Sequence, residues 1–210
     1  MNLRTCLSED EKKRVRADIQ KAEQKTSGDI VAMIVNASAD YSQVDYLGGI
    51  LFALVGFFLP VSLLVTPQPY LILASELSGF AFGFVIFRLP LVKRFWLSEG
   101  YMHHRVERRV LRAFYEHRLH ETENQNGILI LVSLLERRVR ILADRGIYGK
   151  VDPKVWEEMA DKLAEALRTG SLSDGLCNTI RRCGEILSDH FPLRHGGGDL
   201  SADMIVVDRD

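Results

Sequence analysis

The chain has 210 residues, of which 47% are hydrophobic and 26% are charged, and its formal net charge at pH 7 is −1. This length gives room for one sizeable core, or for a soluble domain of roughly 100 to 150 residues and a further segment. The balanced charge argues against nucleic acid as a partner, because phosphate binding requires a clustered positive surface.

The first residues, MNLRTCLSEDEKKR, lack the apolar core of a signal peptide, so we expect no export of this end. Cys6, Cys177 and Cys183 form no C-x-x-C pair, and one of them stays unpaired in any intramolecular disulfide scheme. The sequence therefore predicts reduced thiols.

A helix and a buried strand are predicted before the most apolar part of the chain. The tetrapeptide SEDE, starting at Ser8, has the spacing of a capping box, and Val15, Ile19 and Ala22 follow on one helical face. The run Ile30–Val35 is short, rich in β-branched residues and continuously apolar, which predicts a strand buried on both faces.

The next segment predicts a transmembrane helical hairpin. From Tyr46 to Phe87 the only ionisable side chain apart from two tyrosines is Glu76. YLGGILFALVGFFLPVSLLVTP and YLILASELSGFAFGFVIF are each about long enough to cross a hydrocarbon layer of roughly 30 Å, and prolines separate them. The alternative is a pair of buried helices in a soluble core. Glu76 is either a functional intramembrane carboxylate or a group that reaches the interface with no specific role.

The positive-inside rule gives an orientation for this hairpin. The connection between the spans has no Lys or Arg, whereas basic residues follow the second span: Arg88, Lys93, Arg94, Arg105, Arg108, Arg109 and Arg112. A hairpin returns the chain to the side that it left. We therefore expect an integral membrane protein with both termini cytoplasmic.

Small residues in the spans leave two interpretations open. Gly48, Gly49, Gly56, Gly79 and Gly83 lie where helices can approach closely, and the last two have small-xxx-small spacing. They allow either close packing of the two helices within the hairpin or formation of a homo-oligomer through these faces.

The chain after the hairpin predicts the remainder of an α/β domain. A basic amphipathic helix over about 99–119 has Val106, Val110, Ala113, Phe114 and His117 facing inward. GILILVS and RVRILAD follow as a strand hairpin, and the alternation of arginines with apolar residues in RVRILAD predicts an edge position with one exposed face. Asp152-Pro153 starts one helix, and a second helix runs over about 173–190.

The predicted fold class is α/β: a small sheet flanked by helices and interrupted by the two-helix transmembrane hairpin. Its parts are 1–45 and 90–192 as the two pieces of the domain, 46–89 as the hairpin, and 193–210 as a tail. In this tail, Met204 to Val207 either adds an edge strand or forms a mobile end.

This order of elements resembles the TPM domain family, which occurs in photosystem II repair proteins and in many bacterial membrane-associated proteins. The resemblance rests on SEDEKKRVRADIQKAEQKTSGDIVAMIV and NGILILVSLLERRVRILADRGIYGKVD and covers roughly residues 7–37 and 98–191. The hairpin and the tail HFPLRHGGGDLSADMIVV resemble a bacterial subgroup with two spans inside the domain.

The resemblance implies a four-stranded sheet flanked by helices, often with a divalent metal such as calcium bound by carboxylates. It also implies acid phosphatase activity in some members, and assembly or turnover of membrane complexes in others. Asp152 matches the family's Asp, but Tyr148 stands where the family often has Glu, and Asp144 and Arg145 depart from its small residues.

Asp144 and Asp152 are the candidate metal ligands, since two carboxylates with backbone carbonyls and water suit calcium or magnesium. The alternative is that Asp152 caps a helix and Asp144 stabilises a turn. Asp29 and Asp40 bracket the first strand and are weaker candidates. His103 and His104 precede Glu107, and His117 and His120 share a helical face at a spacing able to hold a transition metal. The alternative, which we favour, is that these histidines form a solvated face.

The function that we expect from the sequence is binding, assembly or quality control at the cytoplasmic face of the membrane. The partners are membrane lipid and an unidentified membrane or cytoplasmic protein, with lipid headgroups or an acidic protein as ligands of the basic helix. The alternative is a metal-dependent, phosphatase-like hydrolase.

Overall fold

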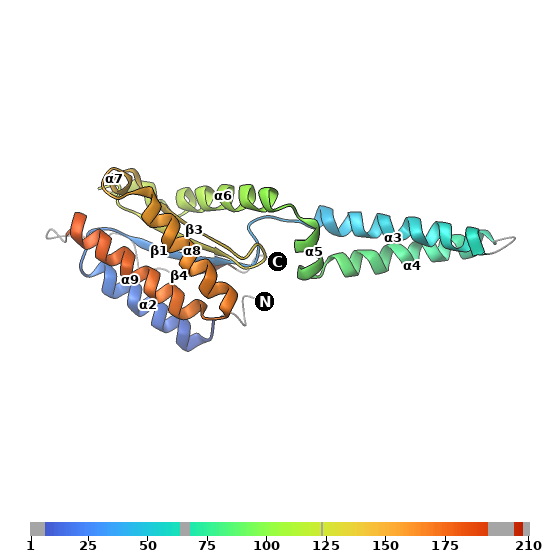
Figure 1. Ribbon diagram of the computed structural model, residues 1–210, viewed down its shortest axis with the longest axis horizontal. Helices are drawn as coiled ribbons and strands as arrows, with labels where there is room; N and C mark the ends of the chain where they lie inside the picture. The colour runs from blue at the N-terminus through green and yellow to red at the C-terminus, as the bar shows by residue number, and fades with distance from the viewer. Residues whose placement is uncertain (1–6, 64–67, 123, 193–203, 208–210) are drawn as a thin grey trace. The chain divides into compact units, whose positions relative to one another are not determined.

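The computed structural model describes residues 7–63, 68–122, 124–192 and 204–207 (Figure 1). The elements follow in the order α2 (Glu9–Glu23), β1 (Ile30–Val35), α3 (Ser42–Leu63), α4 (Pro69–Phe87), α5 (Pro90–Trp96), α6 (Glu99–Glu116), the 3-10 turn η1 (Leu119–Glu121), β2 (Ile128–Ser133), β3 (Arg138–Ala143), α7 (Arg145–Tyr148), α8 (Pro153–Thr169), α9 (Leu172–His190) and β4 (Met204–Val207). They form two compact units: Met1–Ser38 with His103–Asp210, and Ala39–Met102. We call these the α/β domain and the hairpin unit.

The sheet of the α/β domain has four strands in the order β3-β2-β1-β4. β1 pairs in parallel with both β2 and β4, whereas β2 and β3 form an antiparallel pair. Parallel neighbours cannot be joined by a tight turn and require a crossover. The hairpin unit lies in the crossover that joins β1 to β2, so an insertion there interrupts no strand.

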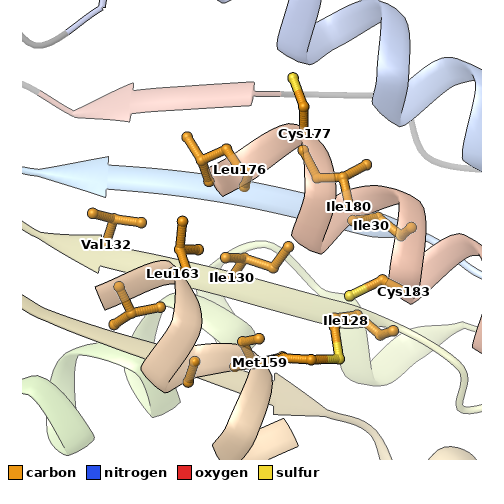
Figure 2. Packing of buried hydrophobic residues seen from close by; sticks show 14 of the residues in the cluster. Ile30, Ile128, Ile130, Val132, Met159, Leu163, Leu176, Cys177, Ile180 and Cys183 are labelled. Carbon is orange, nitrogen blue, oxygen red and sulfur yellow. The ribbon is translucent and has the colours of Figure 1, made fainter. Parts of the chain in front are cut away.

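Two hydrophobic clusters cover the two faces of the sheet. The larger one joins alternate residues of β1, β2 and β3 to α2, α8 and α9. Figure 2 shows part of it, with Ile30, Ile128 and Ile130 among side chains of α8 and α9. The smaller cluster packs Val31, Met33 and other strand residues against α6. All residues of β1 and β2 are buried, which confirms the strand predicted to be buried on both faces.

Local capping signals in the sequence correspond to observed helix ends. The Ser8 backbone N–H donates to Glu11 Oε2 at 2.7 Å, and the Glu11 N–H donates to Ser8 Oγ at 3.2 Å, so the capping box is complete. α8 begins at Pro153 after Asp152, and Gly170 ends it with a φ of 83°, a conformation that glycine adopts without strain.

β3 is an edge strand as predicted, but its arginine face is only half-exposed. Arg138 and Arg140 are of intermediate exposure, while Val139 and Ile141 are buried. The reason is α6, since Glu107 of that helix pairs with Arg140. The alternation in RVRILAD therefore reflects a salt bridge to a covering helix as much as contact with solvent.

The tail contributes β4 beside Ala32–Val35, which is the first of the two alternatives for residues 204–207. Cys6 and the glycines at 196–198 lie outside the described residues. The short helices α5 and α7 were not predicted, because seven and four residues are too few to show a helical period.

Candidate functional site

The hairpin unit packs through its glycines. A Cβ atom on Gly56 would lie 2.3 Å from the Ser75 carbonyl oxygen, and one on Gly83 would lie 2.3 Å from the Gly48 oxygen. The Ser75 hydroxyl donates to the Gly56 carbonyl at 2.7 Å. The small residues thus let α3 and α4 approach closely, and packing within the hairpin accounts for them.

The outer surface of the hairpin is apolar. In each of α3 and α4, only 11% of the most apolar stretch is buried, and both helices are long and apolar enough to cross a membrane. The soluble-core alternative requires buried helices, and the structure does not have them in this segment. Large exposed side chains include Val55, Phe58, Leu59, Leu73, Leu77, Phe82 and Val85. Glu76 is half-buried in α4.

An ion pair lies at the base of the hairpin. Lys93 of α5 donates to Asp45 Oδ2 at 2.9 Å, and the side chains are 16% and 8% exposed. The ring of Trp96 lies 5.2 Å from that of Phe87 between centroids. Asp45 belongs to the first turn of α3 and Phe87 is the last residue of α4, so α5 is held by both long helices.

Asp144, one of the two predicted metal ligands, is buried at the start of α7. Its Oδ1 accepts a hydrogen bond from the Arg145 backbone N–H at 2.7 Å. Its Oδ2 is also buried, and no hydrogen-bond partner for this atom lies in the described part of the chain. A buried carboxylate oxygen without a donor is costly, so this atom can serve as a ligand for a cation.

Asp152, the other predicted ligand, is exposed and caps α8 by accepting from the Lys154 N–H at 2.9 Å. Across residues 7–63, 68–122 and 124–192, no group of three or more His, Cys, Asp or Glu side chains is arranged to hold a metal. Calcium takes roughly six to eight oxygen ligands. Asp144 fits one ligand position, and the described side chains do not complete the set. Asp29 is buried, and Asp40 Oδ1 accepts a hydrogen bond from the Ser42 backbone N–H at 2.9 Å.

A cavity of about 110 Å³ beside β3 was not expected from the sequence. Glu107, Arg140, Tyr148 and Trp156 are among the residues that line it, and Arg140 Nε donates to Glu107 Oε1. Trp156 is buried, and the described residues supply no acceptor for its Nε1–H. The cavity lining thus combines a salt bridge with a phenol and an indole ring. The partners come from four elements, so no sequence spacing reveals it.

A buried polar network lies where β1 and β2 end. The Ser133 hydroxyl donates to Glu136 Oε2 at 2.5 Å, and the Ser38 backbone N–H donates to Glu136 Oε1 at 2.9 Å. Ser133 and Glu136 are 0% and 2% exposed. Glu136 thus binds the strand-connecting turn to Ser38, the residue at which the α/β domain ends and the insertion begins.

A larger groove of about 540 Å³ lies between α2 and α9 and carries charge of both signs. Its cations have partners close at hand: Arg181 lies 3.3 Å from Asp18, and Arg14 lies 2.9 Å from Asp174. The groove is therefore lined largely by charges that have partners.

The basic helix is partly neutralised by its own acids. Arg109 and Arg112 both donate to Glu116, at 3.1 and 2.7 Å, and Arg118 lies 3.9 Å from Glu121. The bond from Arg112, helped by Arg109, lowers the pKa of Glu116. Two of the arginines that the sequence offers to a partner are therefore already paired with Glu116 on the same helix.

The histidines and cysteines form no cluster in the described part of the chain. His103 lies 3.8 Å from Glu107, and His120 lies 4.8 Å from Tyr115 between ring centroids. Cys177 and Cys183 are free and buried. Burial raises the pKa of Cys183 to about 12, and burial followed by a hydrogen bond with Asp18 raises that of Cys177 to about 11.

The fold and the insertion define an α/β sheet domain with an apolar helical hairpin in its first crossover. Residues 92–186 match the family model of the TPM domain, so this part of the chain is similar to that family. The match begins in α5 and ends in α9, and it supports the resemblance for the larger piece of the domain.

A solved structure shares this fold. It is the NMR structure of the BA42 protein from the psychrophilic bacterium Bizionia argentinensis, with a TM-score of 0.60 and 18% identity over 96% of this chain and 95% of that one. At this identity the likeness concerns the fold alone. No curated protein matches the chain.

Proposed function

We propose that the chain is a membrane-anchored binding or assembly module, or a quality-control module, at the cytoplasmic face of a bacterial inner membrane. One observation carries the proposal: α3 and α4 pack through glycines and present large apolar side chains outward. Such a surface is stable in hydrocarbon and unfavourable in water. Because the hairpin returns the chain to the domain that it left, the domain stays on one side of the bilayer.

The site of the insertion supports an anchoring role. The hairpin leaves the domain after Ser38, which Glu136 holds by a hydrogen bond of 2.9 Å, and the chain returns through α6. Both connections enter packed parts of the domain. The domain itself then offers its surface, including the edge of β3, to membrane lipid or to a membrane or cytoplasmic protein.

Topology reporters test the anchoring. We expect a fusion at Gln68 and a fusion at the carboxyl terminus to report opposite sides of the membrane, with the terminus cytoplasmic. A matched pair of variants adds a control: Phe58→Lys places a charge on the outer face of α3, whereas Lys13→Met changes an exposed residue of α2. Loss of membrane integration in F58K alone supports the proposal. Reports from the same side for both fusions contradict it.

The second candidate is a metal-dependent, phosphatase-like hydrolase, favoured by the buried Asp144 Oδ2, for which the described residues supply no donor. Asp144 and Asp152 are the predicted calcium or magnesium ligands. Metal titration of the full chain in micelles, followed by NMR, is expected to shift resonances of the Asp144 to Asp152 loop, and Asp144→Asn to remove the shift. Turnover of a phosphomonoester that is lost in D144N would replace the binding role by this one. Unchanged spectra would remove the metal site.

A further inference from the structure

α5 presents an apolar face of its own at the base of the hairpin. It begins at Pro90, shortly after α4 ends at Phe87. Leu91 is 78% exposed and Phe95 is 88% exposed, the highest value among the large apolar side chains that the structure describes. Residues four apart lie on one face of a helix, so these two side chains form a single apolar surface.

The other side of α5 is fixed to the hairpin. Lys93 forms its buried ion pair with Asp45 of α3, and Trp96 packs on Phe87 of α4. In Figure 1, α5 lies at the end of the hairpin where α3 begins and α4 ends. These two contacts, one to α3 and one to α4, hold α5 in one orientation. Its apolar face therefore has a fixed direction relative to the hairpin.

We infer that α5 is an interfacial helix: Leu91 and Phe95 insert into the boundary between lipid headgroups and acyl chains at the base of the hairpin. This inference rests on the proposed membrane anchoring. The occupant is a lipid surface because α5 follows the end of a span-length helix within three residues, and that end lies at headgroup level when the span crosses the bilayer. Interfacial helices place Trp, Phe and Leu at this level, and Arg94 of the same helix is suited to lipid phosphates.

The ion pair between Asp45 and Lys93 is the positioning element of this surface. Both charges are largely removed from water, so loss of one partner leaves a buried charge without compensation. Asp45 lies in the first turn of α3, where a carboxylate also interacts favourably with the helix dipole. Lys93 therefore sets which face of α5 is turned toward lipid.

Tryptophan fluorescence in lipid vesicles tests the inference on the full chain. The variant Phe95→Trp, with Trp96→Phe and Trp156→Phe, carries a single tryptophan on the apolar face of α5. Vesicles contain phosphatidylcholine and phosphatidylglycerol brominated either close to the headgroup or close to the chain ends. We expect quenching by the shallow bromines and protection from aqueous iodide. Two reference positions in the background W96F and W156F are Phe58→Trp on α3 and Tyr115→Trp on α6.

The reference positions separate this inference from the anchoring. Deep quenching at position 58 with shallow quenching at position 95 supports both. Deep quenching at 58 with iodide access at 95 overturns the interfacial helix and leaves the anchoring in place. A tryptophan at 95 that neither iodide nor bromine reaches is covered by protein, which also overturns the inference. An absence of lipid quenching at position 58 contradicts the anchoring itself.

The positioning role of the ion pair between Asp45 and Lys93 is tested in the same F95W background. Lys93→Met removes the partner of Asp45, and we expect loss of the shallow quenching at 95, whereas Lys93→Arg keeps the charge and retains it. Quenching at position 58 in the matching F58W background is the control for an intact hairpin. Unchanged quenching at 95 in K93M, with the hairpin intact, shows that the ion pair does not position α5.

Discussion

The α/β domain and the hairpin unit distribute their side chains in opposite ways. In the domain, residues such as Leu129 and Leu131 are 0% exposed, and most charged side chains lie at the surface, with Glu136 and Asp144 as buried exceptions. In the hairpin, glycines lie at the helix contact while Leu59 and Phe58 are 55% and 62% exposed. Water drives large apolar groups inward, whereas a hydrocarbon solvent gives them no such preference and leaves close packing to decide. A leucine side chain therefore has a different structural role in each of the two units.

The largest difference is expected for truncated leucines. Leu131→Ala removes a fully buried side chain of β2, so we expect the free energy of unfolding of the α/β domain to fall by about 2–5 kcal/mol. Leu59→Ala on the outer face of α3 is the matched control and leaves this quantity unchanged. Denaturant unfolding of the full chain in nanodiscs, monitored by near-UV circular dichroism, measures both. An equal loss in L59A would contradict the opposite burial of the two leucines.

Glycine substitutions act on the hairpin in the reverse direction. Gly83→Leu places a Cβ 2.3 Å from the Gly48 oxygen, and we expect overpacking to weaken the pairing of α3 with α4 by about 1–3 kcal/mol. Gly100→Ala is the control, because only Ser98 Oγ lies near, at 3.8 Å, and alanine favours the helix. Spin labels at Leu54 and Leu77, on the outer faces, report the pairing. The idea fails if their distance distribution broadens equally in both variants.

Several parts of this arrangement could be predicted from sequence because they depend on local signals. The capping box at Ser8, the Asp152-Pro153 start of α8 and the buried run of β1 are encoded within a few adjacent residues. The hairpin was predictable from the near absence of charge, and the edge position of β3 from its alternation.

The candidate sites were harder to predict because they combine distant residues. Glu136 meets Ser38 across 98 positions, and the cavity of Arg140 and Trp156 joins β3 to α8. The pair of Asp45 with Lys93 joins the first turn of α3 to a helix too short to show a period. In contrast, the sequence predicted Asp144 and Asp152 as metal ligands, but only the fold shows that one is buried and the other is an exposed cap.

The burial of Cys183 predicts that the α/β domain loses stability at alkaline pH. Burial raises the pKa of Cys183 from 9.0 to about 12, so the folded state retains a proton that the unfolded state loses first. The contribution of this thiol is fully present below about pH 9 and is lost as the pH rises toward 12. Between these two pH values the free energy of unfolding falls by about 1.4 kcal/mol per pH unit because of this thiol. Unfolding of wild type and Cys183→Ala from pH 8 to 11 measures it. Parallel curves for the two proteins would contradict the assignment to Cys183.

The smallest effect is expected where the domain exposes its charges. Glu107 and Arg140 are 30% and 37% exposed, so water screens their attraction, and we expect a coupling energy below about 1 kcal/mol. A double-mutant cycle with Glu107→Gln and Arg140→Met isolates this energy, and its decrease at high salt identifies it as electrostatic. The pair of Asp45 with Lys93 is less exposed, at 8% and 16%, so its cycle in nanodiscs is expected to give a larger and less salt-sensitive coupling. Equal couplings would mean that α6 excludes water from the β3 cavity as thoroughly as the base of the hairpin does. In that case Arg140 would be a buried cation, and the edge of β3 would have to be regarded as part of the core.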